Sequence, residues 1–252
     1  MAPASRNTTS QSLEAILSRL SPDSYYQSPG GRRMLISLTL IVGLPRGARV
    51  LDVQCGIGSS SVDVAEAYDA QVIAFDDYPP YLAFGKQQAT SRGVAKKISF
   101  RAIAGKDAEA SIPAGEFDVV LGLGGGLSDT LPGGLSGGLR VAHQWLGPGG
   151  VLILGDLVTP ASTSELMQIV FGESLISESD YLGLVRDAGF DIVYVVRSSS
   201  SDWEEMAQTM QSLSDRSLDL GPPDERQRQR LTAAAKTHPE LAYLSVAARK
   251  SA

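Results

Sequence analysis

Short apolar runs alternate along the chain with longer stretches whose apolar residues recur every three or four positions. The short runs, many of them rich in Val and Ile, predict β-strands at 49–53, 71–75, 98–102, 117–123, 151–154, 191–197 and 243–249. The longer stretches predict amphipathic helices at 59–68, 81–92, 139–146, 164–171 and 179–188. Strands and helices that alternate in units of about 25 residues are typical of an α/β protein with a doubly wound, mostly parallel sheet and helices on both faces.

Other segments surround or interrupt this alternation. Residues 12–44 predict two helices before the sheet, and residues 198–240 predict a mostly helical insert between the last two strands. We expect the insert to cap the edge of the sheet. Residues 1–11 are polar and are expected to form a disordered leader, so the sequence predicts a single domain over residues 12–252.

The charge balance narrows the classes of partner. The 252 residues include 22 Lys and Arg and 28 Asp and Glu, which gives a net charge of −6. Because sequence-independent nucleic-acid binding depends on clustered basic charge, we expect no nucleic-acid partner.

The location of the protein is predicted from its cysteine and its apolar segments. Cys55 is the only cysteine, which excludes an internal disulfide and favours a reducing compartment. The N-terminal residues lack the apolar segment of a secretory signal, and the longest apolar stretch, 34–44, is too short to cross a bilayer. We therefore expect a cytoplasmic protein without a membrane partner. His143 and His238 are too far from Cys55 in sequence to predict a metal site.

The turn after the first strand is the strongest candidate for a ligand site. Asp52 stands near the end of an otherwise apolar strand, and Gly56 and Gly58 follow it. Glycines let the backbone approach a ligand closely and expose amide groups at the start of the next helix. A buried carboxylate needs partners, so Asp52 either accepts hydrogen bonds from a cationic ligand or ties down the turn.

Two more carboxylates follow the next two strands. Asp76 ends the second strand, 24 residues after Asp52. In this fold an acidic group at that place accepts hydrogen bonds from both hydroxyls of a ribose. Asp107 follows the third strand, where it could bind an adenine amino group, although a turn also explains an Asp there.

These positions and several stretches around them resemble class I S-adenosylmethionine-dependent methyltransferases of the small-molecule type. The similar stretches, in the family's order, are SPGGRRMLI (28–36), VLDVQCGIG (50–58), VIAFDDYPPYLAFGKQQA (72–89), FDVVLGLGG (117–125), LGPGGVLIL (146–154) and SESDYLGLVRDAGFDIV (177–193). The resemblance implies a Rossmann-like sheet of seven strands, the last of them antiparallel, and S-adenosylmethionine as the cofactor.

The resemblance also implies roles for individual residues. The methionine part of the cofactor would lie against the turn from Asp52 to Gly58, with Asp76 on the ribose hydroxyls and Asp77 next to the adenine. The remaining positions that it marks for the cofactor are Gly30, Gln54, Cys55, Asp107, Ala108, Gly122 and Leu123.

Gln54 departs from the family, which usually has a glycine at this position. If the position requires a positive φ, Gln costs on the order of 1–2 kcal/mol, which a domain can absorb. If the glycine makes room for the ligand, the Gln side chain would instead crowd the methionine part of the cofactor. Since the surrounding glycines and carboxylates are all present, we expect cofactor binding to be retained.

The predicted function is transfer of a methyl group from S-adenosylmethionine to a small-molecule acceptor. Candidate acceptor contacts are Tyr25, Tyr26, Met34, Ser128, Asp129 and Trp203. Trp203 is spaced with Met206 and Met210 as in a helix that packs on the sheet, so packing is favoured for this group. No residue is singled out as the catalytic base, and a homodimer is compatible with the sequence.

Two other functions stay open. The first is a catalytically inactive relative that binds the cofactor or a metabolite as a sensor or partner protein, which only Gln54 supports. The second is a nicotinamide-dependent oxidoreductase, whose G-x-G-x-x-G motif is contradicted by the serines at 59–61 that follow Gly58.

Overall fold

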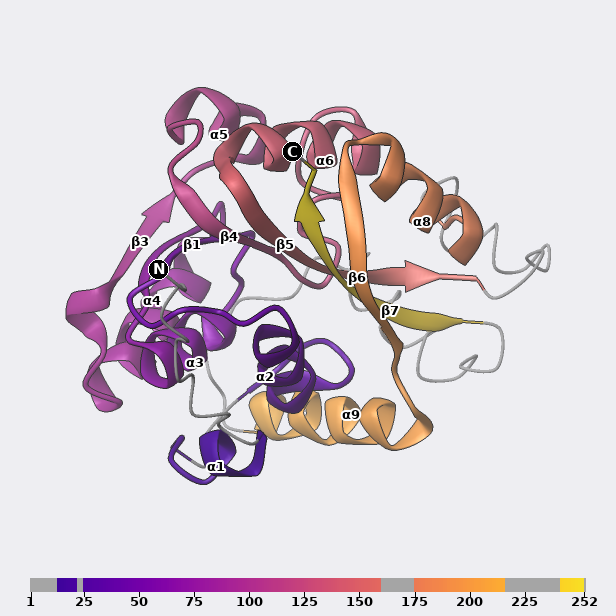
Figure 1. The fold of residues 1–252 in the computed structure, drawn as a ribbon. Coiled ribbons are helices and arrows are strands. Elements are labelled where there is room, and N and C mark those ends of the chain that lie inside the picture. Colours follow the sequence, from indigo (N-terminus) through magenta and orange to yellow (C-terminus); the bar gives the residue numbers. More distant parts are fainter. Residues whose placement is uncertain (1–12, 22–24, 160–174, 216–240, 252) are drawn as a thin grey trace, which may run out of the picture.

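A seven-stranded sheet forms the centre of the computed structural model, which describes residues 13–21, 25–159, 175–215 and 241–251 (Figure 1). The strands are β1 (Arg49–Val53), β2 (Gln71–Asp76), β3 (Ile98–Ala102), β4 (Phe117–Gly122), β5 (Leu146–Val158), β6 (Phe190–Arg197) and β7 (Ala242–Lys250). In space they follow the order β3-β2-β1-β4-β5-β7-β6. Strands β1 to β5 pair in parallel, whereas β7 runs antiparallel to its neighbours β5 and β6. This confirms the predicted fold class, including the antiparallel last strand.

Helices cover both faces of this sheet (Figure 1). They are α1 (Leu13–Leu17), α2 (Gly31–Ile41), α3 (Ser59–Tyr68), α4 (Pro79–Ser91), α5 (Gly105–Ser111), α6 (Gly134–Trp145), α8 (Glu178–Asp187) and α9 (Ser200–Asp215), with a short 3-10 helix η1 at Ala95–Lys97. Helices α5, α6 and α8 lie on one face, and α2, α3 and α4 lie on the other. None of the helices within the described ranges has the length and apolar character needed to cross a bilayer.

Each face of the sheet has its own apolar core, because successive side chains of a strand point to opposite faces. On β1, Val50 belongs to the core that includes Ile36 of α2 and Val62 of α3. Leu51 belongs to the core that includes Leu139 of α6 on the other face. Asp52, the next residue along β1, therefore points its carboxylate toward α3.

The order of the strands determines where a ligand can bind. Strands β2 and β3 follow β1 in the chain and lie on one side of it in the sheet. The chain then crosses over, and β4 and β5 lie on the other side of β1. In open sheets of this type, ligands bind outside the carboxyl ends of the strands at the point where the order reverses. This point lies above β1 and its neighbours β2 and β4.

Some elements differ from those that the sequence predicts. Helix α5 is not among the predicted helices, because seven residues show too little periodicity to reveal it. Strand β5 is longer than predicted: the glycines and proline at 147–150 interrupt the apolar pattern, although Leu146 already pairs with Phe117. The predicted leader at 1–11, the predicted helix at 164–171 and residues 216–240 of the predicted insert lie outside the described residues.

One buried carboxylate connects the N-terminal region to the helices of the sheet. Asp63 of α3 accepts hydrogen bonds from the Tyr26 hydroxyl at 2.8 Å, from two nitrogens of Arg32 at 3.0 Å each, and from Arg92 at 2.6 Å. The Asp63 side chain is fully buried and that of Arg92 is 4% exposed. The carboxylate therefore holds the segment around Tyr26 against α3 and the end of α4.

Asp63→Asn should lower the free energy of unfolding by about 3 kcal/mol, because it leaves the nearly buried Arg92 guanidinium without its full counter-charge. Urea denaturation followed by circular dichroism measures this change. Glu109→Gln is the control, since it breaks an exposed pair with Arg140 and should cause no measurable change. An Asp63→Asn protein as stable as wild type would show that the charge of this buried carboxylate does not stabilise the fold.

Candidate active site

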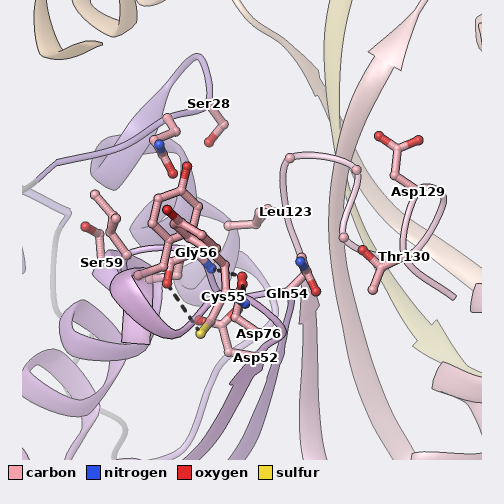
Figure 2. A pocket seen from close by; sticks show the side chains of 18 of the residues that line it. Ser28, Asp52, Gln54, Cys55, Gly56, Ser59, Asp76, Leu123, Asp129 and Thr130 are labelled. Carbon is pink, nitrogen blue, oxygen red and sulfur yellow. Dashed lines mark hydrogen bonds between the residues drawn. The ribbon is translucent and has the colours of Figure 1, made fainter. Parts of the chain in front are cut away.

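A cavity of about 650 Å³ opens at the carboxyl ends of β1, β2 and β4, where the strand order predicts a ligand site. Its lining comes from four main segments: residues 25–28, the turn after β1, the segment after β2 and the loop after β4. Figure 2 shows these side chains converging on one space from both sides of the β1 turn. Parts of the chain far apart in sequence thus contribute to a single site.

The turn between β1 and α3 is built on left-handed backbone. Gly58 is the N-cap of α3 with φ +79°. A Cβ atom there would lie 2.8 Å from the Phe100 ring and 3.2 Å from the backbone of Gly85. Glycine is therefore required at this position both by its backbone angle and by the close approach of α4 and β3.

Asp76 fixes this turn to the end of β2. One carboxylate oxygen accepts a hydrogen bond from the Gly56 backbone N–H at 2.9 Å, and the other accepts one from the Tyr78 N–H at 2.8 Å. The residue is 1% exposed, and its burial raises the pKa of the carboxyl group to about 6. A carboxylate oxygen can accept more than one hydrogen bond, so Asp76 retains capacity for a ligand.

Asp52 is the second buried carboxylate of the site. It accepts a hydrogen bond from the Ser61 hydroxyl at 2.6 Å, which ties β1 to α3. Burial, and to a smaller extent the charge of Asp76, raises the pKa of Asp52 to about 7. Burial also raises the pKa of the neighbouring Cys55 thiol well above its usual range, so this cysteine stays protonated.

Gln54 adopts the left-handed backbone that a glycine would adopt more easily, with φ +52°. A requirement for positive φ, one of the two explanations for the family's glycine, is thus present at this position. The Gln54 side chain donates a hydrogen bond from Nε2 to the carboxylate of Asp77 at 3.1 Å. The side chain therefore lies inside the site and contacts the segment after β2.

The N-terminal segment forms one wall of the cavity. The Ser59 hydroxyl donates to the carbonyl of Tyr25 at 2.6 Å, which anchors this segment to the start of α3. The buried hydroxyl of Tyr243 on β7 accepts a hydrogen bond from the Gly124 N–H at 2.9 Å and forms another with the side chain of Ser28. Tyr243 thus joins the N-terminal segment to the loop after β4.

Most of the residues predicted for the cofactor line this one cavity. They are Asp52, Gln54, Cys55, Gly56, Asp76, Asp77 and Leu123, and of the predicted acceptor contacts Tyr25, Tyr26 and Asp129 line it as well. Gly58 ends the turn as the N-cap of α3 and is not part of the cavity lining. The sequence therefore predicts the part of the cavity lining that comes from the ends of β1 and β2.

Other predicted residues lie outside the lining of this cavity, namely Gly30, Met34, Ala108, Gly122, Ser128 and Trp203. Asp107 is also outside it, with a side chain that is 57% exposed and paired with Lys106. Trp203 packs with Met206 and Tyr243 in a small apolar cluster, as its helical spacing favoured. Ser128 donates to the carboxylate of Asp156 behind the loop after β4.

The cavity also contains residues that were not among the predicted site residues, namely Gln27, Ser28, Ile57, Ser59, Ser60, Tyr78, Tyr81, Gly105, Gly124, Gly125, Gly126 and Thr130. Tyr78 and Tyr81 follow Asp76 and Asp77 directly, so their nearness to a predicted acidic pair was the available signal. Gln27 directly follows the predicted contacts Tyr25 and Tyr26, and Ser28 begins the stretch 28–36 that resembles the family, so the same kind of signal was available for both.

The described lining is acidic. Asp52, Asp76, Asp77 and Asp129 belong to it, and no Lys, Arg or His does so among the residues described. Within the same described residues, no group of His, Cys, Asp and Glu is arranged to hold a metal ion. Buried carboxylates without a nearby cation favour a positively charged ligand, and the glycine turn permits its close approach. A sulfonium amino acid joined to a ribose fits this set of donors and acceptors.

Comparison with known proteins agrees with this chemistry. Residues 50–150 match the family described as the methyltransferase domain. A curated relative, O-methyltransferase cnsE of Penicillium expansum, is 26% identical over 204 residues, which are 74% of this chain and 71% of that protein.

Solved structures share the fold. The S-adenosylmethionine-dependent methyltransferase of Geobacter sulfurreducens, in complex with S-adenosylhomocysteine, has a TM-score of 0.69 at 20% identity, over 92% of this chain and 96% of that chain. The [4+2]-cyclase SpnF has a TM-score of 0.67 at 22% identity, over 95% of this chain and 91% of that chain.

These findings decide between a methyltransferase and a nicotinamide-dependent oxidoreductase. The family match covers β1 through the start of β5, which includes the glycine turn and Asp76. The strand order and the antiparallel β7 agree with the fold that the resemblance implied. Residues 50–150 therefore form a methyltransferase domain, in a chain with the fold of class I S-adenosylmethionine-dependent methyltransferases.

Proposed function

We propose that this protein transfers the methyl group of S-adenosylmethionine to a small-molecule acceptor, and that both bind in the cavity above β1, β2 and β4. The observation that carries the proposal is the pair of buried carboxylates, Asp52 and Asp76, on the two sides of the glycine turn. Burial raises the pKa of both groups, and a cationic ligand offsets the cost of ionising them. The cofactor carries such a charge on its sulfonium group.

The residues around the turn can hold each part of the cofactor. Asp76 has lone pairs left for the two ribose hydroxyls, beyond its bonds from Gly56 and Tyr78. The backbone of the turn faces the methionine part, and Asp77 lies on the side of the adenine. When bound, S-adenosylmethionine supplies an electrophilic methyl group on a sulfonium sulfur.

The acceptor is proposed to lie between residues 25–28 and the loop after β4, which carries Asp129. A cavity of about 650 Å³ that also holds the cofactor leaves room for a small molecule. Much of the acceleration of such a displacement comes from holding the acceptor in line with the methyl group and excluding water. The N-terminal segment, held by Ser59 and Asp63, supplies that enclosure.

A second candidate function is binding of the cofactor without methyl transfer. Two observations favour it: Gln54 stands where the family has glycine, and the fold is shared with a protein named as a [4+2]-cyclase. Calorimetric titration with S-adenosylmethionine and S-adenosylhomocysteine, followed by an assay of S-adenosylhomocysteine release with a panel of small-molecule acceptors, separates the two. Turnover with any acceptor supports methyl transfer, whereas saturable binding without turnover across the panel favours the second function.

Asp76→Ala should weaken binding of S-adenosylmethionine about 100-fold, because it removes the charged acceptor for both ribose hydroxyls. Isothermal titration calorimetry measures the dissociation constant. Asp118→Ala is a matched control, since this exposed carboxylate accepts from the Arg49 N–H at the opposite end of β1. His143→Ala is a second control, because this ring packs edge-on against Phe190, outside the cavity. Equal affinities for wild type and Asp76→Ala would contradict the ribose assignment.

Cofactor affinity should rise about tenfold or more between about pH 5.5 and about pH 8. The raised pKa values of Asp52, about 7, and Asp76, about 6, mean that both are largely protonated at the lower end of this range. A cationic ligand favours the ionised forms, so its binding releases protons and strengthens as these groups ionise. Titration calorimetry in two buffers of different ionisation enthalpy detects the release. Asp52→Asn should remove the upper part of the dependence, and an affinity that is constant with pH would contradict the charge argument.

A further inference from the structure

The side chain of Gln54 spans the carboxyl end of β1. On one side its Cβ lies 3.5 Å from the place where a Cβ on Gly126, in the loop after β4, would stand. On the other side its Nε2 reaches the Asp77 carboxylate, after β2, at 3.1 Å. Figure 2 shows Gln54 between Asp76 and the loop that carries Thr130. The side chain therefore runs from the β4 side of the site, near its Cβ, to the β2 side, where its carboxamide meets Asp77.

The two ends of this carboxamide are not equally satisfied. Nε2 has Asp77 as its acceptor, but Oε1 is buried and accepts no hydrogen bond among the residues described. A buried acceptor without a partner is costly and offsets much of what the bond to Asp77 contributes. The conformation in which the carboxamide is bonded to Asp77 is thus only marginally favoured, and a ligand can displace it.

Gln54 and Asp77 line the same cavity as Asp52, Gly56 and Asp76. In the proposed placement, a cofactor whose methionine part meets the turn and whose ribose meets Asp76 passes close to Gln54 and Asp77, which line the same cavity. The carboxamide that joins these two residues takes up part of this space. It also engages a carboxylate that would otherwise be available to the hydroxyl and N–H groups of the adenosine.

We propose that Gln54 is a gate residue for the cofactor: its carboxamide, held by Asp77, closes part of the cleft in the ligand-free protein and moves away when the cofactor binds. This inference rests on the proposed placement of S-adenosylmethionine. A protein that must first open has an apparent dissociation constant increased by the reciprocal of its open fraction. An open fraction of about one tenth makes the gate weaken cofactor binding about tenfold.

The gate has to be separated from the strain of the left-handed backbone. Gln54→Ala keeps a Cβ at φ +52° but removes the carboxamide, whereas Gln54→Gly removes both. Asp69 is the other non-glycine residue with positive φ in the described chain, at +59°. It caps the C-terminus of α3, pairs with Lys97 and lies outside the cavity, so Asp69→Gly is the matched control for relief of strain.

The first test measures binding of S-adenosylmethionine and S-adenosylhomocysteine by calorimetry and stopped-flow fluorescence. Gln54→Ala and Gln54→Gly should each bind both ligands about tenfold more tightly than wild type, with faster association, and Asp69→Gly should bind like wild type. Tighter binding by Gln54→Gly alone would assign the effect to backbone strain and overturn the gate. Weaker binding by Gln54→Ala would overturn it too, because the carboxamide would then contact the bound cofactor.

The second test is a double-mutant cycle between Gln54→Ala and Asp77→Ala. In the wild-type background, Asp77→Ala removes a cofactor contact but also releases the gate, so the two effects partly cancel. In the Gln54→Ala background only the lost contact remains, and the loss of affinity should be about tenfold larger. Equal losses in the two backgrounds would overturn the gate while leaving the cofactor site intact. Failure of every protein, Gln54→Ala included, to bind either ligand would instead overturn the proposed function.

Discussion

The carboxylate of Asp76 is the interaction on which the site depends. It accepts a hydrogen bond from the backbone N–H of Gly56, after β1, and another from that of Tyr78, after β2. The two loops are thereby fixed to the same carboxylate. Strand pairing alone brings Val53 and Phe75 into register. The hydrogen bonds that Asp76 accepts hold the chain together beyond the last paired residues, in the loops that line the cavity. One buried side chain therefore holds the turn after β1 and the start of the segment after β2 together, at the place proposed for the ribose.

This arrangement places negative charge where the protein does not compensate for it. Asp52 and Asp76 are both buried, and Asp52 has a serine hydroxyl as its hydrogen-bond partner rather than a cation. The contrast with Asp63 is direct, since that carboxylate is buried between two guanidinium groups. The same residue type is neutralised where it connects helices and left unneutralised where a ligand is to bind. Carboxylates buried in this way have raised pKa values, and such groups gather at functional sites.

The sequence predicts the sheet well because β1, β2 and β4, the strands beside the site, are mostly buried runs of β-branched and apolar residues, and glycines follow β1 and β4. Residues 49–53 and 98–102 form strands with the predicted bounds, and 59–68 forms the predicted helix. The turn residues and the acids after β1 and β2 could be found because they adjoin those strands. Tyr243 could not, since it reaches the loop after β4 through packing between distant parts of the chain. For Asp107 the position after β3 was located, but the start of α5 turns its side chain toward solvent and Lys106.

The position of β7 has a consequence for how this protein folds during synthesis. Among the residues that the structure describes, strand β6 pairs in the sheet with β7 alone, and β7 lies between β6 and β5. While the ribosome is producing the residues between β6 and β7, the apolar strand FDIVYVVR has no neighbour with which to pair. Unpaired strand edges of this kind are prone to aggregate. The parallel half of the sheet can form earlier, but the far edge is completed only when the Ala242–Lys250 segment inserts between two strands that are already made.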